Sequence, residues 1–549
     1  MSKSVTTVKS GLEIQNEIIE GVRTVANAVG ITLGPAGKCV AIQGGFEGAI
    51  PEVTRDGATV AKSIRLKNEI QNIGAQLVRK AAESTEEQVG DSTSSTCVLI
   101  RELCEKGRKA AQTGSNINEV KSGMMKASKW ITDYIAKNAI PIEGDLEKIR
   151  KVATISANND PVIGNLVVEC MEKVGTDGVI TADLSYSIDT TVDITTGMKL
   201  DRGWTSPHYV TSPNDGKCIL DDPLIVVAGE KLANINQLAP LINKIMEAGS
   251  RPFLIICDDA DEMVNATLAI NNMRGAIRCC VVKGLDFGDS RKNLMQDIAT
   301  MVGATYLCPE NGIDVSNATI DNLGGAKKVV VSRDSCIIYE GKGSEDEINA
   351  RADILRARLN DPSIASYDKT KFEKRLAGLT GGIGIIRAGG ASEVEKINKK
   401  ATIEDSILAS KSAISEGCAP GCGYIYLMAS LDVKKDKKFW KDLEGDEVEG
   451  AKIVFSSLPE VMRLIAENSG VSGDLVLNEV SKSKKKFWGY NAKTKKYGHL
   501  LDEGILDSAK ALRVAVENSI SAASMILLVD CSLTREEVEN TDAGGDLSI

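Results

Sequence analysis

The chain has 549 residues, which is too long for one compact core and predicts two to four domains. Its net charge of −10 argues against a nucleic-acid binder, which needs a basic face to neutralise phosphates. Its two histidines leave little from which to build a Ser-His-Asp triad or a histidine-rich metal site. Chemistry is therefore expected to depend on carboxylates, hydroxyls, backbone N–H groups and a hard metal ion.

The first third of the chain is predicted to be helical. Apolar residues at helical spacing predict an amphipathic helix over 12–29, a second around Ile70–Ala81 and a third running through Val98 to Cys104. Glycines and a proline in "ITLGPAGK" (31–38) interrupt this pattern.

The middle of the chain alternates short β-like runs with helical patterns, which predicts α/β packing with some parallel strands. The β-like runs are 178–183, 223–229, 252–259, 277–284 and 327–332, and the helical patterns are 234–247, 261–274 and 290–302. Glycine-rich joints at 195–203 and 379–390 bracket this block, and helical periodicity returns beyond 400. The outer segments are therefore expected to form one domain from both ends of the chain.

Two lysine clusters, in 433–450 and 481–490, share the letters KKFW. These clusters could indicate binding to nucleic acid or to a membrane. Acidic residues are frequent in the first cluster, however, so we favour the interpretation that both are solvated loops. No apolar run approaches ~18 residues and the N-terminus lacks an apolar segment, so neither a membrane span nor a signal peptide is expected. The 13 cysteines show no metal-ligand spacing and are typical of free thiols in a reducing cytosol.

The stretch "VGDSTSSTCVLI" (89–100) places Asp91 ahead of five consecutive hydroxyl residues at the start of a predicted helix. Helix N-termini favour phosphate, although one or two of these hydroxyls could simply cap the helix. A carboxylate repels phosphate unless a divalent cation lies between them, and Mg²⁺ uses one or two carboxylates with substrate phosphates. The stretch therefore predicts a Mg-nucleotide site, yet no Walker A or G-x-G-x-x-G pattern is present.

With this stretch the chain resembles the group I chaperonins, the GroEL-like ATP-driven protein-folding machines. The resemblance runs from about residue 10 to 533 and includes, in order, "TLGPAGK" (32–38), "RDGATVA" (55–61), "VGDSTSSTCVL" (89–99), "ATISANND" (153–160), "GMKLDRGWTSP" (197–207), "NNMRGAI" (271–277), "LDFGDSRK" (285–292), "IEDSILA" (403–409), "GYNAKTKKYG" (489–498) and "DEGILD" (502–507). It implies a multidomain α and α/β subunit with a helical equatorial domain (1–138 and 416–549), a small intermediate domain (139–195 and 384–415) and an α/β apical domain (196–383).

The resemblance also implies roles for individual residues. Asp405 would be the catalytic carboxylate with Asp56 near the γ-phosphate, and Asp91 would bind Mg²⁺. Contacts to ATP would come from Thr32, Leu33, Gly34, Pro35, Arg55, Gly57, Ser92, Thr93, Ser94, Ser95, Ile155, Ser156, Gly421, Cys422, Asn491, Ala492 and Asp502. K⁺ would be held by backbone oxygens of Thr32 and Arg55. Hinges would lie at Pro141, Gly197, Gly382 and Gly417, and clients would bind at Trp204, His208, Tyr209, Ala239, Ile242, Asn265, Ala269 and Ile270.

Several positions depart from the family pattern. Ser92 and Cys422 replace glycines that border the nucleotide, and Asn265 and Ala239 replace large aliphatic residues of the client groove. These departures bear on nucleotide affinity and client binding, and they are typical of a divergent, virus-encoded copy.

The expected function is an ATP-dependent chaperone that folds nonnative polypeptides inside a homo-oligomeric ring of seven subunits, with a cochaperonin lid. The expected location is the bacterial cytosol, or the host cytosol for a viral protein, with no nucleic-acid or membrane partner. Two alternatives stay open: a holdase or structural ring without a productive ATPase cycle, and an unrelated metabolic ATP enzyme. The retained Asp56, Asp91 and Asp405 favour the first hypothesis.

Overall fold

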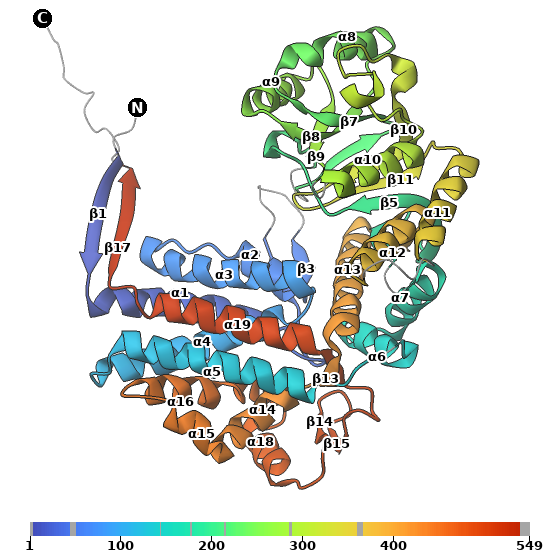
Figure 1. Cartoon of the computed structure of the whole chain (residues 1–549). Helices are drawn as coiled ribbons and strands as arrows, with labels where there is room; N and C mark the ends of the chain where they lie inside the picture. Colours follow the sequence, from blue (N-terminus) through green and yellow to red (C-terminus); the bar gives the residue numbers. More distant parts are fainter. Residues whose placement is uncertain are drawn as a thin grey trace, which may run out of the picture. The chain divides into compact units, whose positions relative to one another are not determined.

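The computed structural model describes residues 4–43, 51–142, 144–175, 178–212, 216–284, 288–359 and 366–537 (Figure 1). Residues 285–287 of the predicted motif at 285–292 lie outside these ranges. The chain forms two compact units. Unit 1 comprises Met1–Val168, Ala182–Thr191 and Arg387–Ile549, and unit 2 comprises Glu169–Thr181 and Val192–Ile386.

Unit 1 is a stack of long helices, because apolar residues recur at helical spacing on each of them. In α1 the residues Ile14, Ile18, Val22, Val25 and Val29 are all buried. This face lets α1 pack against both α3 and α4, while α19 packs against α3, α4 and α5. The first two predicted helices are thereby confirmed, and the third begins within the hydroxyl stretch.

The elements of this unit include a short β-ribbon made from the two ends of the chain. The bounds are β1 Ser4–Ser10, α1 Leu12–Gly30, β2 Val40–Ile42, β3 Glu52–Thr54, α2 Gly57–Ser63, α3 Glu69–Val89, α4 Thr93–Gln112, α5 Ile117–Asn138, α6 Leu146–Ser156, α13 Glu393–Glu416, β13 Cys418–Pro420, α14 Tyr424–Asp432, η5 Val433–Lys435, α15 Lys437–Lys441, α16 Glu447–Ser457, α17 Glu460–Asn468, α18 Gly473–Lys482, β14 Trp488–Asn491, β15 Lys496–His499, β16 Leu506–Ser508, α19 Ala509–Ile526 and β17 Cys531–Glu537. Helix α7 (Pro161–Val174) runs across the boundary between the two units.

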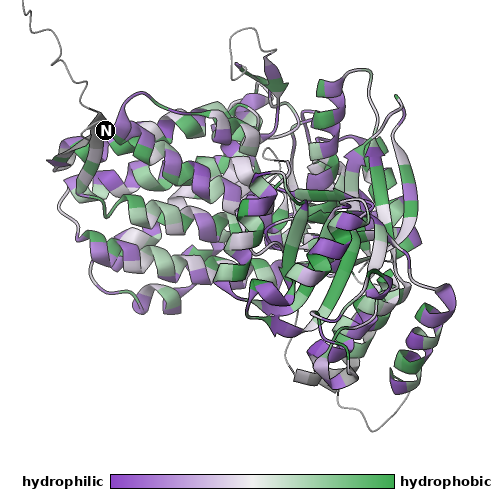
Figure 2. Ribbon diagram, turned by 90° about the horizontal axis from the view of Figure 1, so that it is seen from above, coloured by the Kyte–Doolittle hydropathy of each residue, from purple (hydrophilic) through white to green (hydrophobic). Residues whose placement is uncertain are grey.

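Unit 2 is an α/β unit built on a mixed sheet with strand order β4-β12-β5-β11-β10-β7-β8-β9, in which β6 also pairs with β10. β7, β8 and β9 are parallel, as the alternating pattern predicts, and β10 runs antiparallel to β7. Figure 2 shows the central strands of this sheet apolar along most of their length. Such continuous apolar runs arise because both faces of a parallel sheet are covered.

The elements of this unit are β4 Val179–Leu184, β5 Thr191–Leu200, η1 Pro207–Tyr209, β6 Cys218–Asp221, β7 Leu224–Leu232, η2 Ile235–Gln237, α8 Ala239–Glu247, β8 Phe253–Ala260, α9 Glu262–Met273, β9 Cys279–Lys283, α10 Gly288–Val302, η3 Pro309–Asn311, η4 Ile320–Asn322, β10 Gly324–Val331, β11 Cys336–Gly341, α11 Glu345–Leu359, α12 Ser366–Thr380 and β12 Gly382–Ala388. Strands β4, β5 and β12 extend across the boundary with unit 1.

The four predicted hinge residues fall into two pairs. Pro141 and Gly417 lie beside a bridge in which the backbones of Ile140 and Cys418 exchange hydrogen bonds of 2.7 and 2.9 Å. Gly417 has a φ of 84°, and an added Cβ would come within 2.7 Å of the Ile140 carbonyl oxygen, so only glycine fits.

Gly197 and Gly382 lie in neighbouring strands, β5 and β12, rather than in loops. A Cβ at Gly197 would meet the Ile338 carbonyl oxygen at 2.3 Å. Close packing therefore explains this glycine by itself, and rotation about the four positions stays a prediction.

Within the described ranges, no helix is both long and apolar enough to cross a bilayer. All 13 cysteines are free thiols, and most are buried.

Candidate active site

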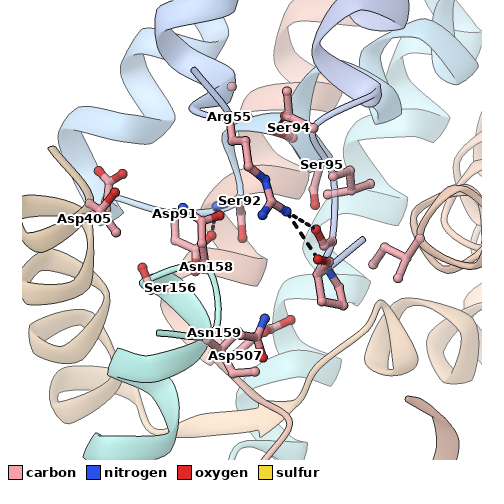
Figure 3. Close-up of a pocket in the computed structure, with 18 of the residues that line it drawn as sticks. Arg55, Asp91, Ser92, Ser94, Ser95, Ser156, Asn158, Asn159, Asp405 and Asp507 are labelled. Atoms are coloured by element: carbon pink, nitrogen blue, oxygen red, sulfur yellow. Dashed lines mark hydrogen bonds between the residues drawn. The ribbon is translucent and has the colours of Figure 1, made fainter. Parts of the chain in front are cut away.

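Unit 1 contains a cavity of about 970 Å³ that collects most of the residues predicted to bind nucleotide (Figure 3). Its wall comes from the loop after α1, the start of α2, the α3–α4 junction, the end of α6, α13, the β14–β15 hairpin and the segment around β16. The predicted residues that line it are Thr32, Leu33, Gly34, Pro35, Arg55, Asp56, Gly57, Asp91, Ser92, Thr93, Ser94, Ser95, Ile155, Ser156, Asp405, Cys422, Asn491, Ala492 and Asp502. Gly421 does not line the cavity, and its N–H donates to the carbonyl oxygen of the lining residue Ile505 at 3.0 Å.

The hydroxyl stretch forms one side of the cavity. Gly90, in the left-handed conformation, caps the end of α3, and α4 begins at Thr93, so Asp91 and Ser92 form the tight turn between the two helices. Across the cavity wall, the hydroxyls of Thr32 and Ser94 lie 3.1 Å apart and share a hydrogen bond. The N-terminus of α4 and its hydroxyls therefore face the space that the sequence assigns to phosphate.

The start of α2 adds a second acid. Asp56 caps this helix by accepting hydrogen bonds from the N–H groups of Ala58 at 3.2 Å and Thr59 at 2.7 Å. The next residue, Gly57, lies so close to the hydroxyl stretch that an added Cβ would sit 2.3 Å from Ser94 Oγ. Glycine at this position therefore lets the two loops meet.

Arg55 fixes the loop that follows α1. Its Nη2 donates to the carbonyl oxygens of Gly34 at 3.1 Å and Pro35 at 3.4 Å (Figure 3). Its buried Nε has no partner among the described residues. Gly34 has a φ of 82°, which suits glycine, so the backbone of "TLGP" is held at the edge of the cavity by a cation.

Asp405 reaches the cavity from α13, more than 300 residues after Asp91. α13 packs closely on the end of α3, because a Cβ added to Gly90 would lie 2.5 Å from Leu408 Cβ. Burial raises the pKa of Asp405 well above its ordinary value, and the nearby Asp56, Glu86 and Asp91 carboxylates raise it further. Three predicted acids from distant parts of the sequence are therefore gathered in one cavity.

The chemistry of Asp91 fits a hard divalent cation. Burial raises the pKa of this carboxyl, whose one hydrogen bond comes from the Ser92 N–H, and no ion pair to it occurs within the described residues. The surrounding donors are oxygens, which Mg²⁺ prefers. The described residues contain no group of three or more His, Cys, Asp or Glu side chains placed to hold a metal, so phosphate and water would have to complete the coordination.

The cavity is also lined by Ile155, Ser156, Asn491 and Ala492, where the base and ribose are predicted to bind. Asn491 Nδ2 donates to Glu503 Oε2 at 2.5 Å. The hydroxyl of Ser156 is buried with no partner within the described part of the chain, which leaves it able to bond a ligand.

The sequence interpretation missed Asp507. All three acids of "DEGILD", Asp502, Glu503 and Asp507, line the cavity, but the Asp502 side chain is 82% exposed and pairs with His499 Nδ1 at 3.0 Å. Asp507 lies between buried Leu506 and Ser508 in β16, and burial together with Asp91 raises its pKa to about 7. The sequence did offer a signal for Asp507, because the apolar residues Ile505 and Leu506 precede it. A carboxylate next to apolar residues is more often buried, and a buried acid is a stronger candidate for a functional site than a solvated one.

These features can be compared with known proteins. A sequence model of the TCP-1/cpn60 chaperonin family matches residues 25–536. The chain belongs to this family. This chaperonin is also similar to a solved structure, the chaperonin gp146 from the bacteriophage EL 2 (Pseudomonas aeruginosa), crystallised in the presence of ATP-BeFx.

The two chains superpose with a TM-score of 0.70 at 21% identity, covering 95% of this chain and 98% of the other. The likeness confirms the predicted fold, a chaperonin subunit with equatorial, intermediate and apical domains. The residue boundaries expected for those domains stay a prediction.

The residues predicted to bind clients lie in unit 2 and do not share one surface. Tyr209 and Ala269 are 0% and 3% exposed, so they belong to the core of unit 2 and are not available for contact in this conformation. The Tyr209 hydroxyl donates to the Asn265 carbonyl oxygen at 3.2 Å, and Asn265 Oδ1 accepts from Thr205 at 2.7 Å. Tyr209 and Asn265 therefore stabilise the packing of unit 2 through hydrogen bonds.

The other members of the predicted set are more accessible. Trp204, Ala239 and Ile242 are half-buried, and His208 and Ile270 are exposed. The sequence interpretation missed Met263 and Met273 of α9, which are 75% and 66% exposed. Flexible methionines suit variable apolar partners, so these two residues add to the candidate client surface.

Proposed function

We propose that this chaperonin hydrolyses ATP in the cavity of unit 1 and uses that cycle to fold nonnative polypeptides. The convergence of Asp56, Asp91 and Asp405 on one cavity carries the proposal. Phosphoryl transfer depends mainly on positioning and charge stabilisation, so acids and hydroxyls suffice without histidine.

The residues of the cavity divide the reaction between them. The N-terminus of α4 and the hydroxyls of Thr93 to Ser95 donate hydrogen bonds to phosphate oxygens. Asp91 holds Mg²⁺, which when bound supplies positive charge to the phosphates. Asp405 orients the attacking water and accepts its proton. Asp56 is the further acid on the γ-phosphate side, and K⁺ is expected near Thr32 and Arg55.

A holdase ring without productive turnover is the second candidate. It is favoured by one observation: Ser92 and Cys422 carry side chains in the cavity wall where the family pattern has glycine. Their extra atoms would reduce the room for nucleotide. Measured turnover separates the two functions.

The test compares Asp405→Ala and Asp91→Ala with the wild type in ATP binding and steady-state phosphate release. Asp405→Ala is expected to bind ATP and to hydrolyse it roughly 10²–10⁴-fold more slowly, because one positioned base is lost. Asp91→Ala is expected to lose Mg-dependent binding.

Glu404→Ala is the matched control, because it removes the neighbouring acid of α13, which pairs with Lys400 at 3.9 Å and does not line the cavity. Wild-type turnover in Asp405→Ala would contradict the assignment of the catalytic carboxylate. A wild-type protein that binds ATP without releasing phosphate would instead support the holdase.

Clients are proposed to bind the exposed apolar residues of unit 2. Ile270→Ser together with Met263→Ser should weaken capture of an unfolded polypeptide while leaving the ATPase unchanged. Unchanged capture would place the client site elsewhere. We further propose a ring of seven subunits with a cochaperonin lid and a cytosolic location.

A further inference from the structure

A second hollow in unit 1 is lined mainly by cations. It has a volume of about 400 Å³, and its wall consists of Lys62, Arg65, Gln76, Arg79, Lys80 and Glu83. None of these residues lines the first cavity. The hollow is therefore separate from the candidate active site, and none of the functions proposed above uses it.

The helical repeat brings these side chains together. Gln76, Arg79, Lys80 and Glu83 lie at positions i, i+3, i+4 and i+7 of α3, so they form one stripe along that helix. α2 ends one residue after Lys62 and packs against α3, and Arg65 follows in the connection between the two helices. The two helices and their connection therefore place the four cations around one hollow.

The described residues balance the charges of the hollow only in part, because Lys62 and Lys80 have acidic partners and the two arginines have none. Four cations face one acid of the wall, Glu83, which lies 3.8 Å from Lys80. The nearby Glu86 pairs with Lys62 at 2.5 Å. Arg65 and Arg79 form no ion pair with any residue that the structure describes. Neighbouring like charges repel one another, and a bound anion would remove that repulsion.

We propose that this hollow binds a small anion of phosphate chemistry that carries at least two negative charges. Two unpaired guanidinium groups present planar forks of N–H donors, which match phosphate oxygens two at a time, and the two lysines add point charges. A volume of about 400 Å³ lies within the range of small-molecule sites. The chain as a whole carries a net charge of −10, so this cluster of cations is a local exception.

The experiment titrates the full-length protein with inorganic pyrophosphate by isothermal calorimetry, with chelator present to remove Mg²⁺ and with salt near the physiological level. The test variant is Arg65→Gln/Arg79→Gln, because neither arginine contacts the first cavity. Lys62 is left intact, since it pairs with Glu86 beside Asp405.

The matched control is Lys67→Gln/Lys129→Gln, which removes the same charge from exposed positions outside the hollow. Any pyrophosphate bound in the first cavity is common to all three proteins and cancels in the comparison. Retained helical circular dichroism and an unchanged melting midpoint without ligand show that the test variant is folded.

The wild type and the control are expected to bind pyrophosphate with equal affinity, and the arginine variant to bind at least tenfold more weakly at one site per chain. Inorganic phosphate, with less charge, should bind more weakly than pyrophosphate. Equal affinity in all three proteins would overturn the proposal. Equal weakening in both variants would show that the effect comes from the overall charge of the protein and not from this hollow, and it would also overturn the proposal. Binding of an acidic peptide without any binding of pyrophosphate would assign the hollow to a protein partner instead.

Discussion

Four residues other than glycine in the wall of the first cavity, Ser92, Asn158, Asn159 and Cys422, hold a left-handed backbone conformation, which asparagine tolerates better than serine or cysteine. Ser92 has a φ of 65° and Cys422 a φ of 56°, and these are the two sites where the sequence departs from glycine in the family pattern. A left-handed residue with a Cβ costs roughly 1–2 kcal/mol. The structure thus gives the physical reason for glycine at these places and locates the strain beside the candidate nucleotide site.

Ser92→Gly and Cys422→Gly should each stabilise the fold by about 1 kcal/mol, because the strain is relieved and part of the gain is offset by the freer unfolded chain. The measurement is the free energy of unfolding in denaturant. Ser521→Gly is the control, since Ser521 is an exposed helical residue of α19 and should instead be destabilised by about 0.5 kcal/mol. A loss of stability in both test variants would show that no strain is stored there.

At the scale of elements, a single acid ties three helices of unit 2 together. Asp297 of α10 is fully buried and bonds Arg351 Nε of α11 at 2.7 Å. It also accepts from Arg375 Nε and Nη2 of α12 at 2.6 and 3.0 Å. Removing one partner of a buried ion pair leaves the other charge uncompensated. Loss of Asp297 would therefore leave the guanidinium groups of both Arg351 and Arg375 without this partner.

Asp297→Ala should therefore destabilise unit 2 by about 3–5 kcal/mol. The expected readouts are a lower denaturation midpoint and faster proteolysis within α11 and α12. Asp353→Ala, which removes an acid that is 71% exposed and pairs with Arg356, should change stability by less than about 1 kcal/mol. Similar losses in the two variants would contradict the proposed clamp.

At the scale of the whole molecule, the ribbon of β1 and β17 points to association. The two strands pair along seven residues, and no other strand that the structure describes pairs with either of them. Val8 and Leu533 face one another across the ribbon and are 64% and 66% exposed. Open edges with apolar side chains are typical sites of contact with another chain.

Light scattering should therefore find particles many times heavier than the 58.5 kDa of one chain. Val8→Lys/Leu533→Lys should shift them towards monomers, because charge would be buried at the contact. Ile354→Lys, on an exposed residue of α11, should leave the particles intact. Monomers at micromolar wild-type concentration would contradict the ring, and unchanged particles in the ribbon variant would place the contact elsewhere.

The sequence by itself determined the local elements and part of the site. Apolar spacing located α1 and α3, and alternating β and helical patterns located the parallel strands β7 to β9, because both signals repeat within a few residues. Asp91 was also predictable, since its neighbours in the chain supply the helix start and the hydroxyls. The motifs and their order were enough to identify the chaperonin family, and the family match over residues 25–536 confirms that identification.

Only the tertiary structure decided which distant groups meet. Asp405 lies beside Asp91 because α13 packs on the end of α3, and no local pattern encodes that contact. Burial likewise separated Asp507 from the exposed Asp502, and it removed Tyr209 and Ala269 from the client surface. The cationic hollow joins a stripe of α3 to the end of α2. The physical reason is common to these cases: periodicity fixes which face of an element is apolar, whereas packing between elements fixes what that face meets.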